Sequence, residues 1–181
     1  MLILRPLNLC WIKGASDDPK DLCAHGDVEF RIDDEVLLAT TGKGLTVSAA
    51  ALYLLRTLSV PHSQRNPVGD HLFPCCGFTM LDLPGQDDVA ICGCPGGEDF
   101  EVLHEAGGTG VVVRAADGRE WQIGWPEWRG GVFRFADCVS DFYAACLPKQ
   151  PTQEDAPGLK KFLDEWQRRR VQPLGRTTHC A

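Results

Sequence analysis

The sequence has no long hydrophobic run. None of its apolar stretches reaches the roughly 18 residues that a membrane-crossing helix needs. The apolar start has no basic segment before it, is interrupted by Arg5 and Pro6, and is followed by no small-residue cleavage site. This pattern is typical of a first strand rather than of a secretory signal. We therefore expect a cytoplasmic protein that does not interact with a membrane.

Positive charge is missing from a long central stretch. Residues 66–113 contain no Lys or Arg but eight acidic residues, and the chain carries a formal net charge of −7. This composition disfavours nucleic-acid binding, which depends on neutralising phosphates with Lys and Arg. The stretch is either a solvated face or an acidic docking surface for a basic protein, because complementary charge raises association rate and selectivity. The candidate contacts are the turn acids Asp87, Asp88, Glu98, Asp99 and Glu101.

Recognisable catalytic motifs are also missing. The segment PGGEDFEV resembles a phosphate loop but lacks the Lys-Ser/Thr pair that such a loop requires. Asp137 and Asp141 are four residues apart, and like charges at this helical spacing repel, which favours a solvated face. No nucleophile signature surrounds any cysteine. The motifs therefore predict no enzyme.

Cysteine, by contrast, is plentiful, with nine residues. An odd number in a chain of this length argues against a pure disulfide framework, so buried thiols without a cofactor are the default. The alternative is a zinc site at His71, Cys75, Cys92 and Cys94, because zinc takes four sulfur or imidazole ligands. Against this set, Cys75 and Cys76 are adjacent, so a strand would present only one of them to a metal. The alternative of a zinc-stabilised protein or a thiol-dependent small enzyme that uses Cys75, Cys76, Cys92 and Cys94 therefore stays open.

Hydrophobic periodicity predicts an α+β fold. Thr46 is a candidate N-cap for a helix over residues 47–58, whose apolar positions nearly circle the axis and predict a buried central helix. Short apolar segments bounded by turn residues predict strands on both sides of this helix. These strands are expected at residues 7–12, 28–33, 35–40, 72–83, 88–94, 99–105, 110–115 and 119–125.

Two further helices close the expected domain, at residues 126–146 and 159–170. Because no long crossover segment separates the later strands, an antiparallel meander is the economical topology. We expect a single α+β domain over residues 1–170, with an antiparallel sheet packed against the central helix and the C-terminal helices. Residues 171–181 are expected to form a flexible tail.

Three of the five tryptophans fall within residues 121–128. Strand alternation places Trp121 and Trp125 in the core or at its edge. Trp128 lies between Glu127 and Arg129 and is expected to be partly exposed. Exposed Trp is a favoured anchor at protein interfaces, so Trp128 joins the candidate partner contacts.

Five segments, in order, carry a resemblance: AALYLLRTL, FPCCGFTM, ICGCPGGEDFEV, VFRFADCVSDFY and FLDEWQRRR. Their order, over residues 28–170, resembles small bacterial proteins, some of which are similar to immunity proteins encoded beside polymorphic or contact-delivered toxins. The resemblance implies a non-enzymatic protein that binds and neutralises a cognate toxin by covering its active site. No motif of that family assigns a toxin contact to a particular residue of this chain.

Overall fold

The first three strands of the chain form one antiparallel sheet. The structure is a computed structural model, and it describes residues 1–12, 17–77 and 79–171. The three strands are β1 (Leu2–Cys10), β2 (His25–Ile32) and β3 (Glu35–Ala39), paired in the order β1-β2-β3. The first strand thus begins well before its predicted start. The turn from β2 to β3 passes through Asp33 with a φ of 52°, a left-handed conformation in which Asp is enriched.

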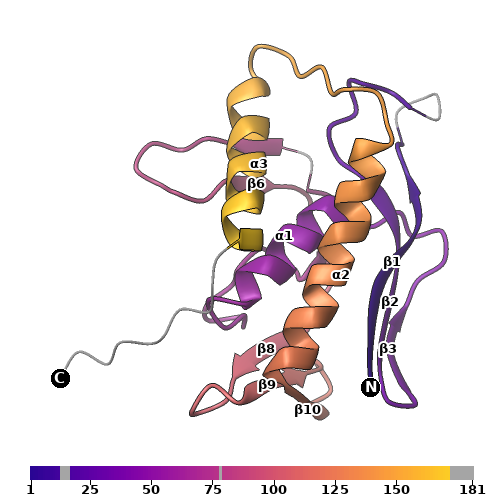
Figure 1. Ribbon diagram of the computed structural model, residues 1–181, viewed down its shortest axis with the longest axis vertical. Helices are drawn as coiled ribbons and strands as arrows, with labels where there is room; N and C mark the ends of the chain where they lie inside the picture. Colours follow the sequence, from indigo (N-terminus) through magenta and orange to yellow (C-terminus); the bar gives the residue numbers. More distant parts are fainter. Residues whose placement is uncertain (13–16, 78, 172–181) are drawn as a thin grey trace.

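Helix α1 (Val47–Thr57) lies at the centre of the fold (Figure 1). All its residues except Arg56 are buried, because it contacts β2, β4, α2 and α3. The predicted buried central helix is confirmed. Thr46 occupies the N-cap position, but its hydroxyl makes no capping bond to the helix.

The remaining strands belong to three further small sheets. The strands β8 (Glu101–His104), β9 (Gly110–Arg114) and β10 (Glu120–Gly124) pair in the order β10-β9-β8. Two short pairs complete the set, β4 (Phe73–Pro74) with β7 (Gly97–Glu98) and β5 (Thr79–Leu81) with β6 (Ala90–Cys92). All pairs are antiparallel, so the predicted α+β class is confirmed. The segment predicted as one strand at 72–83 is divided, because Phe73–Pro74 pair with β7 whereas Thr79–Leu81 pair with β6.

Two long helices pack on this framework. Helix α2 (Trp125–Ala144) has Pro126 in its first turn and runs along β1 and α1 (Figure 1). Its Gly131 permits close approach to β1, because a Cβ atom there would lie 2.6 Å from Cδ2 of Leu2. Helix α3 (Ala156–Val171) contacts β5 and α1.

A buried ion pair connects α3 to α1. Glu165 is fully buried, and its carboxylate accepts from Nε and Nη2 of Arg56, both at 2.8 Å. It also accepts from the N–H of Val89 at 2.8 Å and from Nε of Arg169 at 2.6 Å. Burial favours a raised pKa for Glu165, but the hydrogen bonds and charge of Arg56 outweigh it and hold the pKa below its ordinary value.

The largest hydrophobic cluster includes residues from the first sheet, α1, α2 and the β8–β10 sheet, so these elements form one domain. No helix in the described ranges is long and apolar enough to cross a membrane. Val171 is the last residue of α3, and the rest of the expected tail, 172–181, lies outside the described residues.

Candidate functional site

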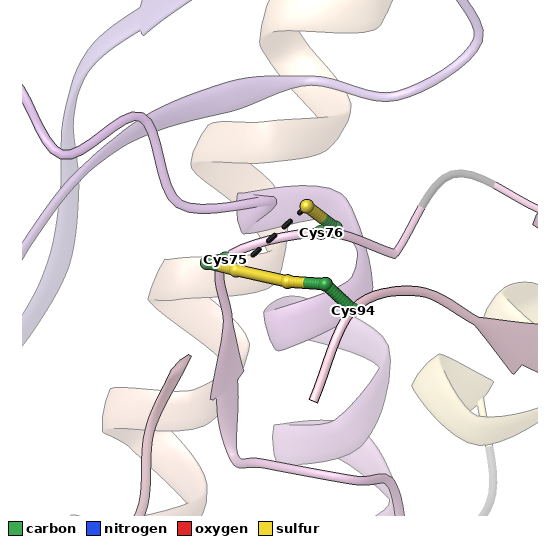
Figure 2. Close-up of side chains that lie close together, drawn as sticks. All are labelled: Cys75, Cys76 and Cys94. Atoms are coloured by element: carbon green, nitrogen blue, oxygen red, sulfur yellow. Dashed lines mark hydrogen bonds between the residues drawn. A yellow bond between two sulfur atoms is a disulfide. The ribbon is translucent and has the colours of Figure 1, made fainter. Parts of the chain in front are cut away.

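A disulfide joins two segments that are distant along the chain. It links Cys75, directly after β4, to Cys94 in the loop between β6 and β7 (Figure 2). The pairing of β4 with β7 brings these segments together. The N–H of Cys75 extends this pairing, since it donates to the carbonyl of Gly96 at 3.0 Å.

A third sulfur lies beside this bond. Sγ of Cys76, a free thiol, is 3.7 Å from Sγ of Cys75, near enough for a weak hydrogen bond (Figure 2). All three sulfur atoms lie within 4.8 Å of one another, and all three residues are half-buried. The expectation that only one of Cys75 and Cys76 faces such a site is wrong, because β4 ends at Pro74 and side-chain alternation ends with it. We call Cys75, Cys76 and Cys94 the cysteine cluster.

Glycine lets the backbone approach the cluster closely. A Cβ atom on Gly96 would lie 3.0 Å from Sγ of Cys75 and 3.4 Å from Sγ of Cys94. A Cβ atom on Gly93 would lie 2.2 Å from the carbonyl oxygen of Cys76, so a side chain there would displace the backbone. The glycines of the β6–β7 loop are therefore part of the construction of the site.

The N-terminal end of α1 contacts the segment that carries Cys75 and Cys76. The N–H of Thr46 donates to the carbonyl of Pro74 at 2.9 Å, and its hydroxyl donates to the carbonyl of Cys75 at 3.4 Å. A Cβ atom on Gly77 would lie 3.0 Å from Cβ of Ala49 in the first turn of α1. Because α1 is buried, these contacts attach the cysteine-bearing segment to a well-packed element.

The zinc ligands predicted from the sequence divide into two groups. Cys75 and Cys94 come together, whereas neither His71 nor Cys92 belongs to the sulfur group that the described residues form. Cys92 is exposed at the end of β6. His71 packs against Gly97, and its buried Nδ1 has no hydrogen-bond partner in the described part of the chain. Cys76 takes the third position, which sequence spacing alone did not assign.

Four of the five candidate acidic contacts already have partners within the chain. Their partners are Arg, Lys or His side chains, and every Arg or Lys among these partners lies outside the stretch 66–113 that lacks Lys and Arg. The pairs are Asp88 with Arg168 and Arg169, Glu98 with Lys43, Asp99 with His62, and Glu101 with Arg114. Asp87 alone of the five is exposed with no side-chain partner among the described residues. Contact with another protein stays a prediction for all five.

Asp99 also has a structural role. Its Oδ1 accepts from Nε2 of His62 at 2.9 Å and from the N–H of Leu72 at 2.8 Å. Nδ1 of His62 accepts from the N–H of Val68 at 3.0 Å, which assigns the proton to Nε2. Burial favours a raised pKa for Asp99, but the hydrogen bonds from His62 and Leu72 outweigh it and hold the pKa below its ordinary value.

Trp128 is fully buried, so the expectation of partial exposure is wrong. Its Nε1–H donates to Oγ1 of Thr57 at 3.2 Å, and its ring lies 6.3 Å from that of Phe30. Trp128 belongs to α2, where successive side chains point about 100° apart, so the charged neighbours Glu127 and Arg129 do not share its direction. A partner cannot contact Trp128 in this fold.

The cysteine cluster is the one group of metal-ligating side chains that the described residues bring together. Comparisons with protein-family models, with curated proteins and with solved structures give no match.

Proposed function

We propose that this chain is a thiol–disulfide exchange protein that works at the cysteine cluster. The observation that carries the proposal is the free thiol of Cys76, 3.7 Å from a sulfur of the Cys75–Cys94 disulfide. Exchange proceeds by attack of a thiolate on one disulfide sulfur and needs access to it. The half-burial of all three cysteines is compatible with such access.

The reaction that we assign oxidises a dithiol. One thiolate of the substrate attacks Sγ of Cys75, the disulfide breaks, and Cys94 leaves as a thiolate that takes up a proton. The second thiolate of the substrate then attacks the substrate sulfur of the mixed disulfide and releases Cys75, which also takes up a proton. Two electrons and two protons thus pass from the substrate to the protein, and the substrate leaves as a disulfide.

Cys76 has a separate role in this scheme. A substrate with a single thiol would remain attached to Cys75 as a mixed disulfide. The thiolate of Cys76 attacks Sγ of Cys75, forms a Cys75–Cys76 bond and expels the substrate as a thiolate, which takes up a proton. Cys76 therefore shortens the lifetime of unproductive mixed disulfides.

The alternative for the same bond is a purely structural role. A disulfide that closes a loop with a sequence separation of 19 residues stabilises a fold by about 3 kcal/mol in the chain-entropy model. A structural disulfide opens when the surrounding fold opens, whereas an exchange centre is attacked in the native protein. When opening of the fold limits the reaction, the rate of disulfide opening is independent of the thiol concentration. Attack on the native disulfide instead has a rate proportional to the thiol concentration.

Native protein incubated with increasing reduced glutathione, quenched by alkylation and analysed by peptide mass spectrometry, separates these roles. We expect an opening rate proportional to glutathione and a glutathione adduct on Cys75 that accumulates several-fold more in Cys76→Ser. Cys92→Ser is the matched control, because Cys92 lies outside the cluster, and it should behave as the unmodified protein. An opening rate independent of glutathione would identify a structural disulfide and overturn the proposal.

We propose toxin binding as a second function, carried by the loop between β5 and β6. Asp87 in this loop is exposed, and Leu83 nearby is 36% exposed. Figure 1 shows the loop extending to one side of the molecule beside α3. An acidic and apolar loop of this kind suits a partner with a basic surface. The other four acids suit it less well, because contact would compete with their internal partners.

A further inference from the structure

We infer that the cysteine cluster, once reduced, binds a thiophilic divalent cation of the zinc class. The inference rests on the proposed function in one respect, since the Cys75–Cys94 disulfide must open before both sulfurs can act as ligands. Three features carry it: the spacing of the sulfurs, the nature of the ligands and the support of their backbone.

The spacing of the Cys75 and Cys76 sulfur atoms matches a tetrahedral metal site. Two thiolates that each lie about 2.3 Å from a tetrahedral zinc ion are separated by about 3.8 Å. Sγ of Cys76 and Sγ of Cys75 are 3.7 Å apart. Sγ of Cys94 lies within 4.8 Å of Sγ of Cys76, and it is bonded to Sγ of Cys75 until the disulfide opens. The Cα atoms of Cys75 and Cys94 are 7.1 Å apart, beyond the usual range of roughly 4.4–6.8 Å for a disulfide. The backbone thus leaves room for an ion between the opened sulfurs.

The ligand set selects a soft metal. All three donors are sulfur, and no carboxylate or imidazole of the described residues joins the group. Thiolates favour zinc and copper(I), whereas magnesium and calcium prefer oxygen. Three protein ligands at a half-buried position leave a fourth coordination site for water or an external ligand, as in catalytic zinc sites.

The backbone already holds the ligands in place. The N–H of Cys75 donates to Gly96, and its carbonyl accepts from the hydroxyl of Thr46. Gly93 lies directly against the carbonyl of Cys76. Because these contacts are made by backbone atoms and the Thr46 hydroxyl rather than by sulfur, they do not depend on the disulfide, and coordination orders few additional degrees of freedom, which favours affinity.

Disulfide and metal exclude each other at this site. A thiol or phosphine reductant supplies two electrons, and two protons are taken up to give the Cys75 and Cys94 thiols. The cation then displaces the protons of three thiols, so its affinity falls as the pH is lowered. A disulfide oxidant such as oxidised glutathione takes two electrons from the same pair and leaves as two thiols, which restores the Cys75–Cys94 bond, removes two of the three ligands and releases the ion.

The test begins with full-length protein reduced by a phosphine, which is removed before titration. Alkylation and mass spectrometry establish that Cys75 and Cys94 are open. Zn²⁺ is titrated in competition with a chromophoric chelator, and Co²⁺ in parallel, because its thiolate charge-transfer absorption reports sulfur ligation. We expect one ion per chain.

Single variants then identify the ligands. Cys75→Ser, Cys76→Ser and Cys94→Ser are each expected to weaken binding at least about tenfold. Cys92→Ser and His71→Ala should keep the original affinity, because neither residue belongs to the cluster. Cys76→Ser is the decisive variant, since it leaves the disulfide intact, and circular dichroism of the metal-free protein checks its fold.

The outcomes separate this inference from the exchange proposal. Binding that survives Cys76→Ser, or that is equally tight in the oxidised protein, overturns the metal site. Opening by glutathione without metal binding leaves exchange standing and removes the metal site. Metal binding after phosphine reduction, with no glutathione-dependent opening of the native protein, leaves the metal site standing and removes exchange.

Discussion

Replacing Glu165 with Gln removes the negative charge from the buried pair that connects α3 to α1. Glu165 is 0% exposed and Arg56 only 12% exposed, so solvent cannot replace the lost charge. Arg56 keeps the carbonyls of Val68 and Val89 as acceptors, both at 2.7 Å, but has no other carboxylate partner in the described structure. Removing one partner of a buried ion pair costs about 3–5 kcal/mol. Since 1 kcal/mol shifts Tm by roughly 2–4 °C at this size, Glu165→Gln should lower Tm by about 6–20 °C.

Thermal unfolding followed by calorimetry measures this loss against a control on the same helix. Asp164 is the neighbouring carboxylate, but it is 58% exposed and pairs with Lys160 at the surface. Exposed pairs contribute little to stability, so Asp164→Asn should leave Tm nearly unchanged. The double variant Arg56→Met/Glu165→Met should recover part of the loss, because it removes both charges of the pair. Recovery stays partial, because the carbonyls of Val68 and Val89 lose their donor, and the N–H of Val89 and Nε of Arg169 lose their acceptor.

The pH dependence of Glu165→Gln provides a second readout. The pKa of Glu165 is lowered in the folded protein, so its ionised form stabilises the fold above the ordinary pKa of 4.5. This stabilisation is lost as the pH falls through the lowered pKa of the folded state. The Tm difference between the unmodified protein and Glu165→Gln should therefore be constant near neutral pH and shrink in acid. A Tm loss no greater than that of Asp164→Asn would refute the assigned role of the buried pair.

Asp99→Asn should destabilise the protein by about 1.5–3 kcal/mol in urea unfolding, because Asp99 accepts charge-assisted hydrogen bonds from His62 and Leu72. Its pKa is lowered in the folded state, so the difference should persist at neutral pH and vanish in acid, and an unchanged urea midpoint would contradict this role. Asp87→Lys should weaken binding to a basic toxin partner, measured by calorimetric titration, without changing Tm, because its side chain has no partner among the described residues. Equal affinity of both proteins would remove the β5–β6 loop from the second proposed function.

Local patterns predicted most of the secondary structure. The helix at residues 47–58 was expected to be buried because it lacks a polar face, and α1 is buried on all sides. Turn residues were expected between the strands, and Asp117 and Gly118 form the turn between β9 and β10, with a φ of 86° at Gly118. Such features depend on a few neighbouring residues, and for that reason they can be read from the sequence.

The division of the strands could not be read in the same way. Residues 72–83 have the composition of one strand, but they enter two ladders with different partners, β7 and β6. Strand pairing depends on segments distant in sequence, and their identity is not encoded in the apolar pattern of either strand. The cysteine cluster has the same origin, because Cys76 joins it only when the chain leaves β4 after Pro74.

The sequence by itself determined the α+β class, the central helix, the turns and the concentration of acidic residues between 66 and 113. Only the tertiary structure decided that Lys43, Arg114, Arg168 and Arg169 neutralise acids of that stretch, and that Trp128 is enclosed. It also decided which three of the cysteines meet. The physical reason is the range over which these effects act. Propensity and periodicity depend on a few neighbouring residues. Charge pairing, burial and sulfur contacts join segments that are distant along the chain, and the local sequence of one segment does not identify the other.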